Sequence, residues 1–147
     1  MTLKYYFAYG GNTNPNHMRR SYPNAKYVGK ACLPNFKVIF QSTDWYTNTH
    51  STNLIEDAYC NIIYNAGGSV YGILYELSEE DIVKLDAQER VPSLYTKYTI
   101  PELNAFTYVM NTDNYKESIP SLRYYNVVSY GYKHYELPLS QIEITIL

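Results

Sequence analysis

The segment of residues 69–88 restricts the possible folds more than any other part of the chain. Its first nine residues, SVYGILYEL, combine β-branched and aromatic side chains and predict a strand. Ser78 then has the side chain of a helix N-cap, with Asp81 three residues later as in a capping box. We expect the helix to run to about Gln88. A strand that passes directly into a capped helix indicates a fold that mixes both kinds of element.

Short apolar runs elsewhere predict more strands than helices. Helices are predicted after the Asn14-Pro15 cap and over residues 122–132, and the polar residues 42–53 are predicted as loop. The alternating residues 142–146 have the pattern of a short strand. No linker or repeat interrupts the chain, so we predict one α+β domain over residues 1–147, a mixed, mainly antiparallel sheet or small barrel with flanking helices. Further strands are predicted at residues 5–9, 36–41, 58–64, 95–100 and 105–110.

The charge and composition exclude several classes of function. A net charge of −2 without clustered Lys and Arg argues against a nucleic-acid partner, although 19 tyrosines offer rings for stacking. No run of about 18 apolar residues occurs, so we expect no membrane span, and we expect no signal peptide. Cys32 and Cys60 lie far apart in apolar surroundings, which predicts free buried thiols and a cytoplasmic protein.

The patterns of several catalytic classes are missing. His17, His50 and His134 have no metal-ligand spacing to one another or to the cysteines, so we predict no metal site. No G-x-S-x-G nucleophile elbow occurs.

Glu89 is the first candidate for chemistry because it continues the apolar face of a helix. It follows Ile82 and Leu85 at helical spacing, while charged residues cover the opposite side. A carboxylate on such a face is costly unless it is paired or used in function. The alternatives are that Glu89 turns to solvent past the helix end, or that it pairs with Arg90.

The second candidate is the sequence Tyr9-Gly10-Gly11-Asn12, which follows a predicted strand. Paired glycines allow close approach of a ligand, and successive N–H groups in such a turn can bind an anion. An ordinary tight turn is the alternative. The sequence does not match a dinucleotide or phosphate-binding loop.

Three ordered motifs together resemble a known family. The opening YFAYGGN, residues 6–12, resembles the Y-x-x-Y-G-S-N start of γ-glutamylcyclotransferase-like proteins. Residues 70–89, VYGILYELSEEDIVKLDAQE, look like their strand–helix segment, in which Leu-Asp-x-x-Glu ends at the catalytic glutamate, and Tyr95 also fits. Residues 108–110 and 124–139 resemble the family's later strand and its C-terminal helix region. The resemblance covers nearly the whole chain.

The resemblance implies a compact β-barrel with flanking helices and a reaction without metal or cofactor. A γ-glutamyl compound would be converted to 5-oxoproline and a free amine, with Glu89 as the acid/base. The partner would be a small-molecule γ-glutamyl substrate, and a homodimer is left open. The substrate-binding residues would be Tyr6, Phe7, Ala8, Tyr9, Gly10, Gly11, Asn12, Tyr95 and Tyr124.

Two departures from the family pattern concern the leaving group more than the chemistry. Gly11 stands where the family usually has serine, and residues 131–136 are larger than expected there. One alternative is a γ-glutamylamine cyclotransferase acting on an isopeptide or a small-molecule amine, because Glu-Arg-Val-Pro at residues 89–92 resembles that branch. Outside this class, the chain could be a non-catalytic binding module for a small acid, or a tyrosine-rich interaction protein.

Overall fold

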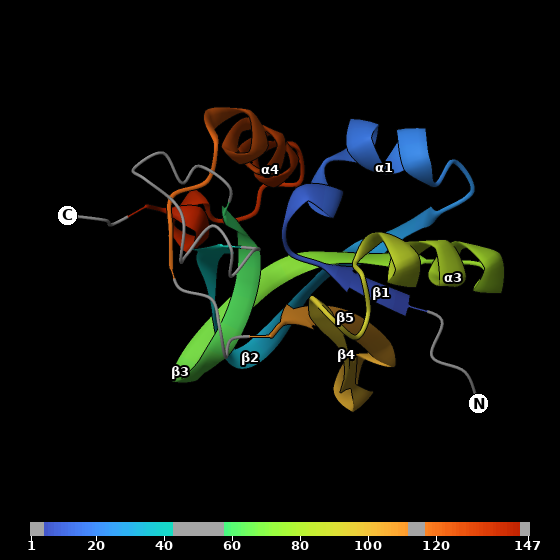
Figure 1. The fold of residues 1–147 in the computed structure, drawn as a ribbon, viewed down its shortest axis with the longest axis horizontal. Helices are drawn as coiled ribbons and strands as arrows, with labels where there is room; N and C mark the ends of the chain where they lie inside the picture. Colours follow the sequence, from blue (N-terminus) through green and yellow to red (C-terminus); the bar gives the residue numbers. More distant parts are fainter. Residues whose placement is uncertain (1–4, 43–57, 112–116, 145–147) are drawn as a thin grey trace.

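The computed structural model describes residues 5–42, 58–111 and 117–144, and its strands form a five-stranded sheet in the order β2-β3-β1-β5-β4 (Figure 1). Neighbouring strands run antiparallel except β1 and β5, which are parallel. The α+β class and the mainly antiparallel sheet are therefore confirmed. No pairing among the described residues joins the edge strands β2 and β4, so closure into a barrel stays a prediction. The strands are β1 (Tyr5–Ala8), β2 (Lys26–Ser42), β3 (Ala58–Glu76), β4 (Tyr95–Ile100) and β5 (Ala105–Met110).

The long strands β2 and β3 pair over most of their length, with register shifts between Tyr27 and Gly29 and between Pro34 and Phe36. The register shifts next to Asn35, and Gly67, with φ of 82°, donates its N–H to the Asn35 Oδ1 at 3.0 Å. Our separation of residues 58–64 and 69–77 into two strands is therefore wrong. The turn-like residues between them form an irregularity within one strand, because a bulge needs the same backbone freedom as a turn.

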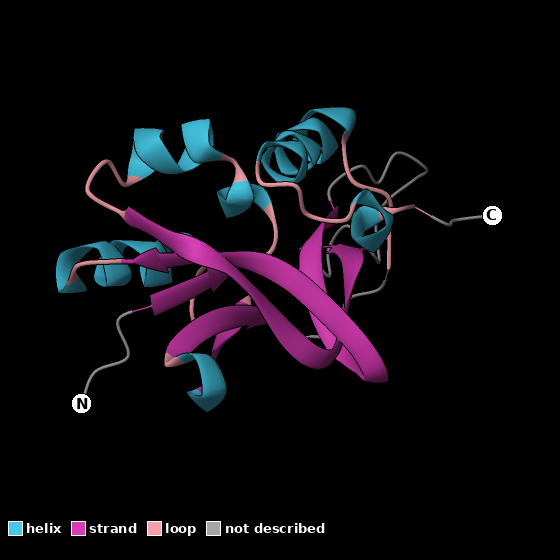
Figure 2. Cartoon of the chain, turned by 180° about the vertical axis from the view of Figure 1, so that it is seen from behind, coloured by secondary structure: helices cyan, strands magenta, loops and turns pink. Residues whose placement is uncertain are grey.

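The α-helices gather largely on one side of the sheet. Figures 1 and 2 show α1 and α4 above the β2–β3 pair in both views. No helix in the described ranges has the length and apolar run needed to cross a membrane. The helices are α1 (Pro15–Ser21), α3 (Glu79–Gln88) and α4 (Leu122–His134), and the short 3₁₀ turns are η1 (Gly11–Thr13), η2 (Pro101–Leu103) and η3 (Leu139–Ile142).

The helix starts agree with the predicted caps. The Asn14 side chain accepts the N–H groups of Asn16 and His17, and the Ser78 Oγ accepts the Asp81 N–H at 3.1 Å. The strand-like alternation of residues 142–146 does not form a strand where it is described, because Ile142 is the buried last residue of η3. Residues 145–147, His50 and most of the predicted loop lie outside the described residues.

Helix α4 is fixed closely against the turn that follows β1. Gly131 allows this approach, because a Cβ at that position would overlap Thr13. The Tyr132 hydroxyl donates to the Tyr9 carbonyl at 2.6 Å, and the Asn14 Nδ2 donates to the Val127 carbonyl at 3.0 Å. These contacts bring two regions far apart in the sequence to one place, where the candidate site lies.

Candidate active site

A cavity of about 540 Å³ opens between the turn after β1, strands β3 to β5, the end of α3, and α4. Most of the residues that the sequence predicted as a site line this one cavity. Glu89 comes from the end of α3, and the other predicted residues come from four separate elements. The predicted residues that line the cavity are Tyr6, Tyr9, Gly10, Gly11, Asn12, Glu89, Tyr95 and Tyr124.

Two predicted substrate contacts do not line the cavity. Phe7 is fully buried in β1, its carbonyl accepts the Thr107 hydroxyl at 2.7 Å, and its ring packs over Gly72. Ala8 is equally buried, with its carbonyl close to Gly72. Their role as substrate contacts stays a prediction, and the lining of the cavity does not support it.

Glu89 is the C-cap residue of α3, and its N–H bonds to the Leu85 carbonyl at 2.9 Å. Leu85 is fully buried and Ile82 partly buried, as the predicted apolar face requires. Burial raises the pKa of the Glu89 carboxyl to about 7. The alternative pairing with Arg90 is not observed, since the ion pair found among the described residues joins Asp86 to Lys97.

The Gly10-Gly11 turn forms part of the wall of the cavity. A Cβ on Gly10 would lie 3.0 Å from the Cys60 Cβ and 3.2 Å from the Tyr124 hydroxyl oxygen. A Cβ on Gly11 would lie 3.5 Å from the Tyr124 Cε1, which is an ordinary contact. The Gly10 carbonyl accepts both the N–H and the hydroxyl of Thr13. The turn is therefore fixed, and the first N–H groups of η1 have no acceptor within the turn itself.

Tyrosine hydroxyls line the cavity and are held by hydrogen bonds. The Tyr95 hydroxyl donates to the Cys60 carbonyl at 3.0 Å, and the Tyr124 hydroxyl accepts the Cys60 N–H at 3.1 Å. The Tyr6 hydroxyl accepts the Asn12 Nδ2 at 3.1 Å. Burial is the largest cause that raises the pKa of the Tyr6, Tyr9, Tyr95 and Tyr124 hydroxyls well above the usual value. These hydroxyls therefore remain neutral at physiological pH.

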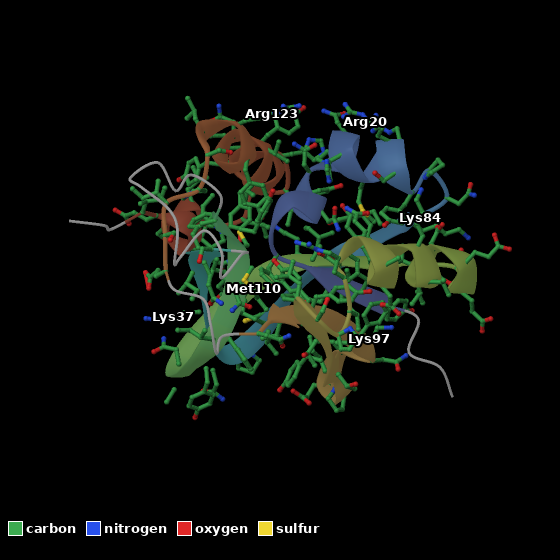
Figure 3. The ribbon with its side chains drawn as sticks, in the orientation of Figure 1. Arg20, Lys37, Lys84, Lys97, Met110 and Arg123 are labelled. Carbon is green, nitrogen blue, oxygen red and sulfur yellow. The ribbon has the colours of Figure 1, made fainter. Side chains whose placement is uncertain are left out.

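The lining also holds basic side chains that the sequence did not point to. Arg90 follows α3, Arg123 is the second residue of α4, and His17 lies on α1. Arg123 lies on the same upper side of the molecule as α1 in Figure 3. Burial, together with Arg20, lowers the pKa of His17, so this imidazole is neutral at pH 7. Tertiary structure alone brings these three elements together, and no local pattern marks their side chains.

Thiol and metal chemistry have little support in this cavity. Burial raises the pKa of the Cys60 thiol to about 12, whereas a nucleophilic cysteine needs a lowered pKa. Cys32 and Cys60 are both free. Within residues 5–42, 58–111 and 117–144, no group of three His, Cys, Asp or Glu side chains could hold a metal ion.

Comparisons with known proteins agree with this arrangement. Gamma-glutamylcyclotransferase of Homo sapiens is 27% identical over 146 residues, covering 94% of this chain and 74% of that protein. The Bos taurus gamma-glutamylcyclotransferase is 28% identical over 142 residues, covering 91% and 72%. A solved structure of a gamma-glutamyl cyclotransferase superposes with a TM-score of 0.73 at 25% identity, covering 93% of this chain and 82% of that one.

The sequence model of a protein family matches most of the chain. The family is described as gamma-glutamyl cyclotransferase, AIG2-like, and the match covers residues 6–126. That range includes both walls of the cavity, from the turn after β1 to Tyr124. The chain therefore belongs to the gamma-glutamyl cyclotransferase, AIG2-like family of enzymes.

Proposed function

We propose that this enzyme converts a γ-glutamyl substrate to 5-oxoproline and a free amine, with Glu89 as the general acid/base. The observation that carries the proposal is a carboxyl group with a pKa of about 7 in the same cavity as the Gly10-Gly11 turn. The relatives named gamma-glutamylcyclotransferase support the same class of reaction.

The first step is attack by the substrate on itself. The neutral α-amine of the γ-glutamyl group adds to its own γ-carbonyl carbon and closes a five-membered ring. A free α-amino group has a pKa of about 7.7–8.0, so much of it must be deprotonated before attack. The nitrogen that has attacked gives up its extra proton to the Glu89 carboxylate.

In the second step the original amide bond breaks. The carbonyl carbon loses its bond to the leaving nitrogen, and the protonated Glu89 returns the proton to that nitrogen. The products are 5-oxoproline and the free amine, no water is consumed, and Glu89 ends as a carboxylate. A group that both accepts and donates a proton works best with a pKa near the working pH, which about 7 satisfies.

The rigid wall of the cavity supplies the other part of catalysis. Holding the substrate folded, with amine and carbonyl in contact, can be worth an effective molarity of about 10⁵–10⁸ M. We assign this holding to the fixed tyrosine hydroxyls and to the first N–H groups of η1. Those N–H groups suit either the α-carboxylate or the negative charge that develops on the γ-carbonyl oxygen.

The basic side chains favour a leaving amine that carries a carboxylate. Glu89 is the one acidic residue in the described lining of the cavity, whereas Arg90 and Arg123 are both cationic. Neither guanidinium has an ion pair within the described residues. A γ-glutamyl amino acid would place its second carboxylate near them, and a γ-glutamylamine has no such group. We therefore favour γ-glutamyl amino acids over γ-glutamylamines as substrates.

The test compares γ-glutamyl-alanine with γ-glutamyl-ethylamine, whose leaving groups differ essentially by one carboxylate. 5-Oxoproline is measured by mass spectrometry. We expect faster product formation from γ-glutamyl-alanine, and Arg123→Gln should raise its KM without affecting γ-glutamyl-ethylamine. Faster turnover of γ-glutamyl-ethylamine would favour the γ-glutamylamine alternative. Binding of both compounds, measured by calorimetry, without product from either or from a wider γ-glutamyl panel would support the binding module instead.

A further inference from the structure

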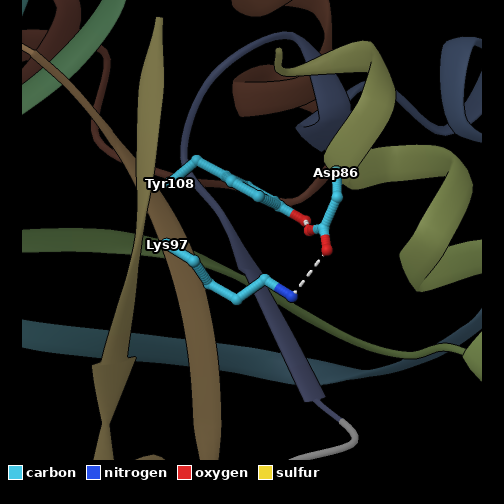
Figure 4. Close-up of polar contacts among 3 residues, drawn as sticks. All are labelled: Asp86, Lys97 and Tyr108. Atoms are coloured by element: carbon cyan, nitrogen blue, oxygen red, sulfur yellow. Dashed lines mark hydrogen bonds and ion pairs between the residues drawn. The ribbon is translucent and has the colours of Figure 1, made fainter. Parts of the chain in front are cut away.

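One carboxylate of α3 connects this helix to both β4 and β5 (Figure 4). The Tyr108 hydroxyl donates to the Asp86 Oδ1 at 2.6 Å, and the Lys97 Nζ donates to the Asp86 Oδ2 at 2.9 Å. The Lys97 Nζ also lies 4.8 Å from the centre of the Phe106 ring. Asp86, Lys97 and Tyr108, which we call the anchor cluster, therefore join three elements.

The anchor cluster acts on the last turn of α3, which carries Glu89. Asp86 lies three residues before Glu89, and its carbonyl accepts the Val91 N–H at 3.1 Å. The last turn of α3 contains no basic residue to interact with its free carbonyls. Helix ends open more readily than helix centres, so this turn depends on contacts with the rest of the molecule.

The two contacts of Asp86 differ in strength. The side chains of Lys97 and Asp86 are 34% and 33% exposed, and an ion pair of that exposure contributes little. Tyr108 is buried and lines the cavity, and its short hydrogen bond to a carboxylate is of the strong, charge-assisted kind. The bond between Tyr108 and Asp86 is therefore the main link between the cluster and the site.

We propose that Asp86 is a positioning residue for the catalytic carboxyl. Through Tyr108 and Lys97 it fixes the last turn of α3 against β4 and β5, and so keeps Glu89 half-buried in the cavity. The inference rests on the proposed role of Glu89. Asp86 itself touches no reacting atom and acts through the placement of the turn.

This role predicts a change in the pH profile. Without the anchor, water reaches Glu89, burial weakens, and its pKa moves from about 7 toward 4.5. The acid limb of kcat/KM then moves to lower pH. A general loss of folded protein would instead lower the rate by the same factor at every pH.

Other titratable groups around the cavity are not expected to produce this limb. His17 on α1 has a lowered pKa, so it titrates below Glu89. The charged side chains of Arg90 after α3 and Arg123 on α4 also line the cavity. Cys60 on β3 and the buried tyrosines of β1, β4, β5 and α4 have pKa values raised by burial, so they titrate far above it.

The experiment measures 5-oxoproline formation by the full chain from pH 4.5 to 9 for the wild type and for Asp86→Ala, which removes both contacts of this side chain. We expect kcat to fall by about 10²-fold, as for a catalytic group displaced by about 1 Å, together with an acid limb at lower pH. Asp86→Glu should restore part of both. Glu79→Gln, an exposed change in the first turn of the same helix, is the control.

An Asp86→Ala enzyme with the wild-type pH profile would overturn the proposal. If Asp86→Ala does not fold by circular dichroism, Tyr108→Phe replaces it, because it removes the 2.6 Å bond and leaves the Lys97 contact. In that case Tyr108→Phe must show the same shift of the acid limb of kcat/KM to lower pH. Failure of the proposed function can be told apart from failure of this inference. If Glu89 is not the acid/base, Glu89→Gln keeps the wild-type rate, and this result does not depend on the Asp86 variants.

Discussion

Two cavities of similar size, both lined by described residues, differ in the role of their polar side chains. The first, about 540 Å³, is the candidate active site, and the second, about 460 Å³, lies between the middle of the β2–β3 pair and the segment around η3. In the second, the Gln141 amide exchanges two hydrogen bonds with the backbone of Tyr71, at 2.7 and 2.8 Å. Its polar side chain thus serves to hold the segment around η3 on β3.

The first cavity differs by holding a carboxyl whose protonation is balanced near neutral pH. Glu89 is surrounded by hydroxyls that are already fixed to backbone groups or neighbouring side chains, such as those of Tyr95 and Tyr6. The comparison teaches that volume does not identify the site. The feature that points to the candidate site is a titrating group among fixed tyrosine hydroxyls, and each of the following predictions tests that difference.

The largest expected effect separates the two cavities directly. Glu89→Gln is nearly isosteric and removes the titrating group, so turnover should fall by about 10²–10⁴-fold. Glu143→Gln, in the lining of the second cavity, should leave the rate unchanged. The measurement is 5-oxoproline release under saturating substrate. Equal losses in both variants would remove the distinction between the cavities.

A matched control lies on α3 itself. Glu80 is exposed in the first turn of the helix, so Glu80→Gln should be near neutral. Full activity of Glu89→Gln with loss in Glu80→Gln would reverse the assignment of the two helix faces.

The next effect concerns stability. The pKa of Glu89 is raised from 4.5 to about 7 on folding, so between these values the folded state binds more protons than the unfolded one. Stability from this group is therefore present at low pH and lost as the pH rises through 7. Glu89→Gln should stabilise the protein by up to about 3 kcal/mol at pH 8 and by little at pH 4.5. Thermal unfolding at both pH values checks this, and an equal gain at both would contradict it.

A smaller effect compares two neighbouring glycines of the cavity wall. Gly10→Ala places a Cβ 3.0 Å from that of Cys60, so the neighbouring atoms must give by a few tenths of an ångström, and we expect a cost of about 1–3 kcal/mol. Gly11→Ala makes an ordinary contact of 3.5 Å with Tyr124 and should be near neutral. Denaturation midpoints and KM values measure both changes. A larger loss of stability or a larger rise in KM for Gly11→Ala than for Gly10→Ala would contradict the predicted ranking of the two glycines.

The smallest expected effect is none at all. Treatment with EDTA should leave turnover unchanged, because the described part of the cavity has no metal-ligand group. Thiol-blocking reagents should also have no effect, since the Cys60 thiol is buried and its pKa is about 12. Loss of activity with EDTA that a divalent ion restores would contradict the metal-free mechanism.

The parts of the fold that the sequence predicts correctly depend on local signals. The Ser78 cap, the end of α3 at Gln88 and the strands β4 and β5 follow from residue types within one short window. Glu89 was found in the same way, from the helical spacing after Leu85.

What the sequence could not show depends on contacts between distant segments. Asp86 meets Lys97 and Tyr108 only because α3 lies against β4 and β5, and Arg123 reaches the cavity only because α4 is fixed on η1. Phe7 illustrates another limit, since it lies within a contiguous motif, yet its ring packs on Gly72 and it is not among the lining residues of the cavity. A motif read as a continuous string does not record which face of the strand each residue occupies.

The attachment of α4 to the turn after β1 has a consequence for biosynthesis. The Tyr132–Tyr9 hydrogen bond joins residues 123 positions apart, and the Thr107–Phe7 bond joins residues 100 apart. Contacts of such long range make the contact order high, and ordering so long a loop delays folding. On the ribosome the turn after β1 emerges early and must wait for α4 before the wall of the cavity can close. The nascent chain therefore lacks part of the wall of the candidate site until its synthesis has passed α4.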